Sequence, residues 1–97
     1  MRHEILLAPE ALEDLSRRDA VRRAEVRAAM EKHLRHEPTK VSKSRIKLLR
    51  DVRRPGYRLR VGEIRVFYDV SGGVVEVLAI VPKSQAGKWL SEWEVAE

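Results

Sequence analysis

The amino-acid sequence predicts an α+β fold in which an N-terminal strand and a helical hairpin pack on a small antiparallel sheet. Three observations lead to this class. The length suits a single domain over residues 1–97. Apolar residues recur with a helical period in the first half, and they alternate as in strands in the second half. The resulting order is β-α-α-β-β-β-α, and an antiparallel meander covered by the hairpin is its simplest packing.

The first half of the chain predicts a short strand followed by two helices. Residues 5–7 are an apolar run, and Pro9 suits the first turn of the helix that follows. Asp19 is a good N-cap for a second helix, which Pro38 should end near His36. One side of this second helix is apolar. Its apolar residues are Val26, Ala29, Met30 and Leu34.

The second half predicts three strands and a last helix. The first strand covers residues 46–61, with an interruption at a Pro-Gly pair, and it ends in an alternating segment. After a glycine turn, residues 64–70 alternate in the same way, which is typical of strands with one buried face. Residues 74–81 are nearly all apolar, as expected of a central strand covered on both faces. Residues 84–93 can form a short helix.

The positive charge is concentrated in one segment. The chain has a net charge of +5 and an isoelectric point near 10.0. Residues 40–65 hold ten basic and two acidic residues, a net charge of +8, which leaves −3 for the rest. This is the electrostatic footprint of a polyanion binder, with RNA or DNA the first candidate and a solvated surface the alternative. The candidate RNA-binding residues are Lys43, Arg45, Lys47, Arg50, Arg53 and Arg54.

Several other classes of function are disfavoured. The chain has no cysteine, so it has neither disulfides nor thiolate chemistry. No apolar run approaches the roughly 20 residues of a membrane span, and no signal peptide is recognisable. We therefore expect a soluble, cytoplasmic protein. His33 and His36 are three residues apart but have no third metal ligand placed by sequence, so they and His3 are expected to be surface residues. No metal and no cofactor is expected.

The predicted hairpin places arginines opposite one another. Arg58 and Arg60 share the charged face of their strand. If residues 62–63 form the turn, Arg60 lies opposite Arg65; if the turn is one residue earlier, Arg58 does. Like charges across a ladder are destabilising by several tenths of a kcal/mol, and a bound phosphate would compensate, because guanidinium groups fit phosphate oxygens. The alternative is that these arginines extend into water.

These residues form a pattern that resembles a known family. Residues 46–49 and 56–68 are similar to the signature of the RelE/ParE superfamily, in which a basic Y-R-(L/I)-R strand pairs with an (I/Y)-R-(V/L)-(F/V)-Y strand. Val77–Lys83 resembles the last strand of that family and the basic residue after it. The resemblance covers nearly the whole chain. It implies a RelE-like fold and the toxin half of a type II toxin–antitoxin pair, with a cognate antitoxin as partner.

The resemblance also implies an activity and its residues. RelE toxins are metal-independent endoribonucleases that cut mRNA on the ribosome through basic groups on the concave face of the sheet, so the ribosome and mRNA are implied partners. Carried over by position, these groups are Arg58, Arg60, Arg65 and Lys83. Arginines suit the negative charge that develops on the phosphate but stay protonated. Lys83 is therefore the candidate for proton transfer, and it and Arg65 are the leading catalytic candidates.

Two positions depart from the nuclease pattern. Ser84 stands where these nucleases often have arginine, and Leu90 stands near the position of a tyrosine or histidine. The departures favour a ParE-type toxin, which inhibits DNA gyrase and is not an enzyme, whereas the basic face favours the nuclease. An inactive nucleic-acid-binding relative is a third alternative.

The aromatic residues have a simpler interpretation. Trp89 and Trp93 can stack on bases, but packing of the last helix on the sheet, or on a partner, is favoured. Tyr57 and Tyr68 fall on the apolar face of their strands and are expected in the core.

Overall fold

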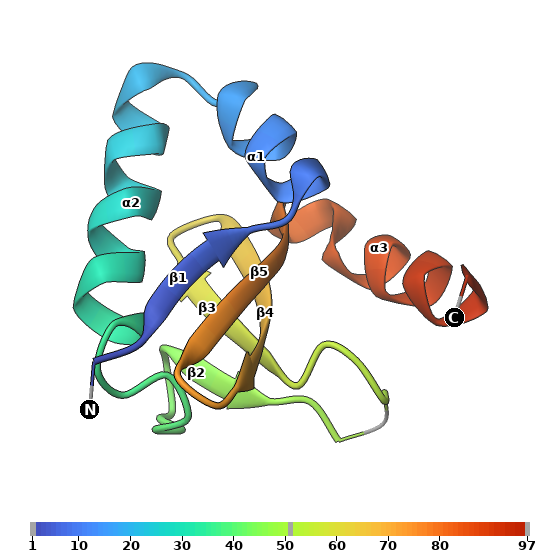
Figure 1. Cartoon of the computed structure of the whole chain (residues 1–97). Coiled ribbons are helices and arrows are strands. Elements are labelled where there is room, and N and C mark those ends of the chain that lie inside the picture. The colour runs from blue at the N-terminus through green and yellow to red at the C-terminus, as the bar shows by residue number, and fades with distance from the viewer. Residues whose placement is uncertain (1, 51, 97) are drawn as a thin grey trace.

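The computed structural model describes residues 2–50 and 52–96, and it confirms the α+β class (Figure 1). The helical hairpin lies against one side of a twisted sheet, and the last helix leaves the sheet near the end of the last strand. The elements are β1 (Glu4–Leu7), α1 (Pro9–Ser16), α2 (Ala20–Leu34), β2 (Ile46–Leu48), β3 (Tyr57–Val61), β4 (Ile64–Ser71), β5 (Val74–Pro82) and α3 (Lys83–Ala96).

Two features of the sheet correct the expected order. The segment expected as one interrupted strand forms two antiparallel strands, β2 and β3, because the chain reverses between them. The order is therefore β-α-α-β-β-β-β-α. The N-terminal strand also joins the sheet, as a parallel edge strand beside β5, which makes the sheet mixed. The strand order is β1-β5-β4-β3-β2.

The helix ends follow local signals. Pro9 is the first residue of α1, where its missing amide loses no hydrogen bond. Asp19 caps α2, and its side chain accepts a 2.8 Å hydrogen bond from the amide of Arg22. The helix ends at Leu34, two residues before the expected end, and Pro38 is buried in the segment that follows.

Most of the core lies between the sheet and the helical hairpin. Buried residues of α1 and α2 pack against buried residues of β2, β3, β4 and β5 and against half-buried residues of β1. Tyr68 is fully buried here, which confirms it as a core residue. Tyr57 is half-buried and stacks on Tyr68 against the core, with 5.6 Å between the ring centroids. The strand β5 is central and largely buried, as expected, and a bulge at Leu78 interrupts its pairing with β4.

The opposite face of the sheet carries a smaller cluster under α3. Phe67, Ala79 and Val81 are buried there against apolar side chains of α3 and of the segment after β2. The sheet is thus covered on both faces, by the hairpin on one and partly by α3 on the other. Over the described residues, none of the helices has the length and apolarity to cross a bilayer.

Candidate nucleic-acid interface

Basic residues of β2, β3 and β4 share the sheet face that α3 partly covers. The β3–β4 turn falls at residues 62–63, where Gly62 has a φ of 58°, so Arg60 lies opposite Arg65 in the ladder. Lys47 lies opposite Arg58 in the same way. Residues that face each other across a ladder project to the same side of the sheet. We call this set of residues, Lys47, Arg58, Arg60 and Arg65, the arginine face.

The three arginines differ in exposure. Arg60 is exposed, whereas Arg65 is only 5% exposed. The Nη1 of Arg65 donates to the carbonyl oxygens of Gly62 at 2.7 Å and of Ile64 at 3.1 Å. One end of its guanidinium therefore closes the β3–β4 turn. Arg65 therefore supplies positive charge from a fixed position near the β3–β4 turn. Arg60, directly opposite it in the ladder, is exposed to solvent.

Arg58 lies between these two environments. Its side chain is half-buried, and its Nε is buried without a hydrogen-bond partner among the described residues. Burial lowers the pKa of Arg58 from its ordinary value, and the positive charges of Arg65 and Arg60 lower it further. The guanidinium remains charged, because arginine stays protonated in proteins. A half-buried cation near two others is an unfavourable arrangement that an anion would relieve.

Lys83 lies at the Arg60–Arg65 end of the arginine face. It is the first residue of α3, and its backbone amide donates a 2.7 Å hydrogen bond to the carbonyl of Glu63 in the β3–β4 turn. Its side chain is exposed. The structure therefore brings the four candidate catalytic residues to the same side of the sheet or to the turn at its end.

The last helix is held on this face by an aromatic stack. The rings of Phe67 and Trp89 are 4.8 Å apart, and those of Trp89 and Trp93 are 5.2 Å apart. The guanidinium carbon of Arg54 lies 5.9 Å from the ring centroid of Trp93. These contacts confirm that Trp89 packs α3 on the sheet, and Trp93 extends the stack along the helix. Trp89 also donates a 3.2 Å hydrogen bond to Glu10, which connects α3 to α1.

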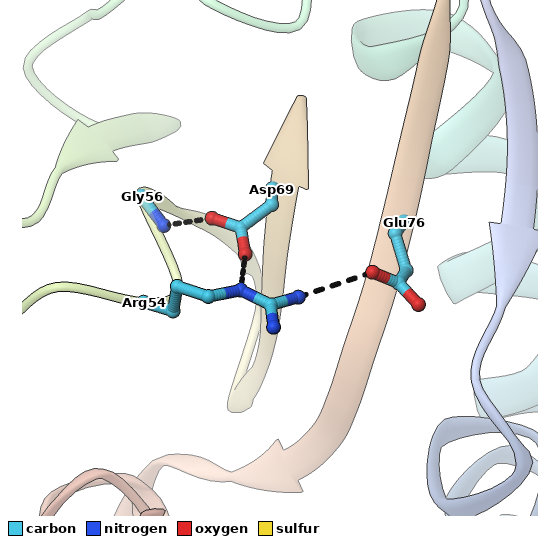
Figure 2. A network of polar contacts seen from close by, with 4 residues as sticks. All are labelled: Arg54, Gly56, Asp69 and Glu76. Carbon is cyan, nitrogen blue, oxygen red and sulfur yellow. Dashed lines mark hydrogen bonds and ion pairs between the residues drawn. The ribbon is translucent and has the colours of Figure 1, made fainter. Parts of the chain in front are cut away.

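Arg54 is bound to two carboxylates at the far end of the same face (Figure 2). Its Nε lies 2.7 Å from Oδ2 of Asp69, and its Nη2 lies 3.1 Å from Oε1 of Glu76. The other oxygen of Asp69 accepts a hydrogen bond from the amide of Gly56. Because two acids surround this guanidinium, Arg54 adds little positive potential, and it is the least suited of the six candidate RNA-binding residues.

The other five candidate RNA-binding residues are exposed on β2, the edge strand of the sheet, and on the segments before and after it. They are Lys43, Arg45, Lys47, Arg50 and Arg53. A hollow of about 400 Å³ lies between this edge and α3, with apolar walls and with Lys47 and Arg50 among its lining residues. The arginine face thus continues into a basic, exposed edge.

The histidines are partly as expected. His36 is exposed, but His3 and His33 are half-buried. The amide of His3 donates a 2.6 Å hydrogen bond to the carbonyl of Arg35 at the end of α2. Burial lowers the pKa of His33, and the charges of Arg45 and Lys32 lower it further. In the described part of the chain, no three His, Asp or Glu side chains converge on a possible metal position.

The fold and the site define a small α+β protein with a cationic sheet face, and several solved structures have a similar fold. No protein-family model and no curated protein sequence matches the chain. A chain of the archaeal RelE–RelB complex from Pyrococcus horikoshii is similar with a TM-score of 0.71 and 21% identity, over 89% of this chain and 100% of that chain.

Two further solved structures are also similar in fold to this chain. A chain of the RelB–RelE antitoxin–toxin complex from Methanococcus jannaschii is similar with a TM-score of 0.66 and 19% identity, over 87% of this chain and 96% of that chain. A copper-bound mutant toxin from Helicobacter pylori is similar with a TM-score of 0.58 and 13% identity, over 89% of this chain and 99% of that chain. The chain has a RelE-like toxin fold, as the sequence resemblance implied.

Proposed function

We propose that this protein is the toxin of a type II toxin–antitoxin pair and that it cuts mRNA on the ribosome without a metal. The observation that carries the proposal is the arginine face on a RelE-like fold. Three guanidinium groups meet on one side of β3 and β4, and no acid of the described residues is paired with Arg58, Arg60 or Arg65. A scissile phosphate would supply the missing negative charge.

The exposure of each residue suggests its role. In metal-free cleavage the 2′-hydroxyl of the RNA attacks the adjacent phosphate, and the 5′-oxygen leaves. Arg60 and Arg58 would bind the phosphate and stabilise its developing charge, with Arg65 adding potential from its fixed place in the turn. Lys83, exposed at the same end, would give a proton to the leaving 5′-oxygen, while the proton of the 2′-hydroxyl would pass to solvent.

The exposed basic edge would hold the RNA beyond the cleaved bond. Lys43, Arg45, Lys47, Arg50 and Arg53 can contact backbone phosphates, which add affinity without base specificity. Arg54 would instead stabilise the fold, since its guanidinium lies on Asp69 and Glu76.

A cognate antitoxin is the expected protein partner. The chains similar in fold come from RelE–RelB complexes. This chain offers an open hollow of about 460 Å³ between β1, α1 and α2, with apolar walls that include Leu12, which is 56% exposed, and with Arg27 at its edge. Arg35 also lines the hollow, but its guanidinium is bound to Glu31. An antitoxin helix with an apolar stripe and an acidic residue against Arg27 would match this surface.

A gyrase inhibitor of the ParE type is the second candidate. Ser84 follows Lys83 and carries no positive charge, and Leu90 packs against the sheet cluster and cannot transfer a proton, so neither position supplies the group that RelE nucleases have there. This observation favours a toxin that binds its target without chemistry.

The experiment that separates the two is translation of a defined mRNA in a reconstituted bacterial system. Primer extension would locate mRNA ends for the wild type, for the Arg60→Ala, Lys83→Ala double variant and for Arg22→Ala, an exposed arginine of α2 away from the arginine face. The nuclease predicts codon-positioned breaks that persist in Arg22→Ala and disappear in the double variant. Intact mRNA at high protein concentration, together with inhibited gyrase supercoiling, would establish the second candidate.

A further inference from the structure

A second basic hollow lies outside the arginine face, where the end of α2 meets the start of β2. It has a volume of about 270 Å³. Its walls come from the last turn of α2, from the segment that connects α2 to β2, and from β2 itself. The lining residues are Lys32, His33, Glu37, Lys40, Ser42, Arg45 and Ile46.

The charges around this hollow are unbalanced. Three cations, Lys32, Lys40 and Arg45, line it together with one carboxylate, that of Glu37. Glu37 pairs with Lys40 at 3.7 Å, but both side chains are about 70% exposed, so the pair is weak. The charges of Arg45 and Lys32 also reach His33, whose pKa they lower after the larger effect of burial. Converging cations of this kind favour a bound anion.

The loop that carries Arg45 is held in place by its own hydrogen bonds. The hydroxyl oxygen of Ser42 accepts from the amides of Arg45 at 3.1 Å and of Ile46 at 3.3 Å. The amide of Ser42 donates in turn to the carbonyl of Ile46 at 3.0 Å. The hydroxyl proton of Ser42 is left to donate to a ligand. The hollow is therefore a preformed concavity with cationic and neutral donors on its walls.

Arg45 also joins this hollow to the arginine face. Its carbonyl accepts a 2.8 Å hydrogen bond from the amide of Arg60, and its Nη1 lies 3.3 Å from the carbonyl oxygen of Arg60. The next basic residue along the chain, Lys47, belongs to the arginine face. A strand of RNA that leaves Arg60 and passes around the β2 edge would reach the hollow.

We propose that the hollow lined by Lys32, His33, Lys40 and Arg45 binds a backbone phosphate of an RNA strand that also contacts the arginine face. The inference rests on the proposed function only for the identity of the ligand as RNA. The phosphate accepts hydrogen bonds from the guanidinium of Arg45 and from the ammonium groups of Lys32 and Lys40. Its charge favours the protonated form of His33, so that binding strengthens as the pH falls.

The charged groups that surround His33 set the direction of this pH dependence. In the free protein, burial acts most strongly against protonation of His33, and the charges of Arg45 from the loop and Lys32 from the same helix add to this effect. Lys40, which lines the same hollow, adds a third positive charge, and Glu37, which pairs only weakly with it, opposes that charge in part. A bound phosphate cancels the effect of the cations, so the pKa of His33 rises in the complex.

The test is a nuclear magnetic resonance titration of the histidine ring protons of the full chain. The two probes are an unstructured single-stranded RNA of about twelve nucleotides and inorganic phosphate. The RNA should shift the His33 resonances and raise the pKa of His33, while the exposed His36 serves as the internal reference. The proposal would be overturned if inorganic phosphate saturated the His33 shift at the same concentration as RNA. It would also be overturned if RNA left the resonances and the pKa of His33 unchanged.

Matched variants identify the contacts. The Lys32→Ala, Arg45→Ala double variant should weaken RNA binding roughly tenfold at low salt and reduce the slope of log K against log salt by about 1.4, as expected for two lost single-strand phosphate contacts. Arg22→Ala, which removes an exposed cation from the other end of α2, should leave both values near those of the wild type. Equal losses of RNA affinity in the two variants would mean that RNA responds to the overall surface charge and not to this hollow, which would contradict the proposal.

The two proposals can fail separately. If mRNA stays intact in the translation assay but RNA still raises the pKa of His33, the phosphate site stands and the nuclease assignment falls. If mRNA is cut and His33 does not respond to RNA, the nuclease assignment stands and the phosphate site falls.

Discussion

The hydroxyl of Tyr68, in the middle of β4, donates a 2.6 Å hydrogen bond to the backbone carbonyl of Pro38. Both residues are fully buried. The bond joins the core of the sheet to the segment between α2 and β2, the same segment that carries the second basic hollow. A buried carbonyl that loses its donor is destabilising, so this single bond helps to fix how the basic edge is presented.

We expect Tyr68→Phe to lower the free energy of unfolding by about 1–2 kcal/mol, because the ring still fills its place but the Pro38 carbonyl is left unpaired. Tyr57→Phe is the matched control, since it preserves the ring that stacks on Tyr68. Urea denaturation of both variants measures the difference. Equal stabilities would show that the hydrogen bond contributes nothing.

Tyr68 also predicts a loss of stability at alkaline pH. Burial raises the pKa of Tyr68 above its ordinary value. A raised pKa in the folded state means that its contribution is complete below the unfolded value near 10 and is lost as the pH rises above it. Wild-type stability should therefore fall more steeply above about pH 10 than that of Tyr68→Phe. Parallel pH profiles of unfolding would contradict this.

Asp14 of α1 supplies a hydrogen-bond acceptor to an amide of β5 with which β1 does not pair. Its Oδ2 accepts a 3.0 Å hydrogen bond from the amide of Ile80, beyond the point where β1 stops pairing with β5. Asp14→Ala should cost about 1–2 kcal/mol, because the Ile80 amide loses its acceptor. Asp14→Asn retains an acceptor oxygen and should be much less destabilising. Thermal unfolding at neutral pH ranks the three proteins.

The titration of Asp14 makes the stability difference between wild type and Asp14→Asn depend on pH. Burial raises the pKa of Asp14, and the hydrogen bond from Ile80 only partly opposes that effect. With a raised folded pKa, its contribution to stability is complete below the unfolded value near 3.9 and falls as the pH rises through the folded value. Asp14→Asn should therefore gain stability relative to wild type between acidic and neutral pH. A constant difference would refute the assigned direction.

Arg60 and Arg65 face each other but should respond oppositely to mutation. Arg65→Ala removes two hydrogen bonds from the β3–β4 turn and should cost about 1.5–3 kcal/mol. Arg60→Ala removes an exposed like charge and should leave stability equal or a few tenths of a kcal/mol higher. Under the proposed function, Arg60→Ala is the one of these two variants that combines normal stability with loss of mRNA cleavage. Denaturation and primer extension on the same preparations check both effects.

Asp69 should matter more than Glu76 for the contact between Arg54 and α3. Asp69→Ala removes the acceptor of both Arg54 and the Gly56 amide and should cost about 1–3 kcal/mol. Glu76→Ala removes a half-exposed ion pair and should cost less than about 1 kcal/mol. Because Arg54 lies over Trp93, tryptophan fluorescence should change in Asp69→Ala. An unchanged spectrum with wild-type stability would contradict this role of Asp69.

Local signals in the sequence were sufficient for most elements and for the hairpin. Asp19 and Pro9 act within one helical turn, and Gly62 accepts a backbone conformation that other residues rarely adopt. The alternation of side chains in the two strands limited the partner of Arg65 to Arg58 or Arg60. These features depend on neighbours a few residues away, so the sequence alone determines them or reduces them to two choices.

The tertiary structure decided which charges are free and which surfaces are covered. The sequence does not show that Arg54 binds Asp69 and Glu76, that Arg65 turns back onto its own turn, or that Lys32 and Arg45 meet at one hollow. The parallel pairing of β1 with β5 likewise joins residues about 70 positions apart. Such contacts depend on how the whole chain buries its apolar faces, because no local preference specifies a partner so distant in the sequence.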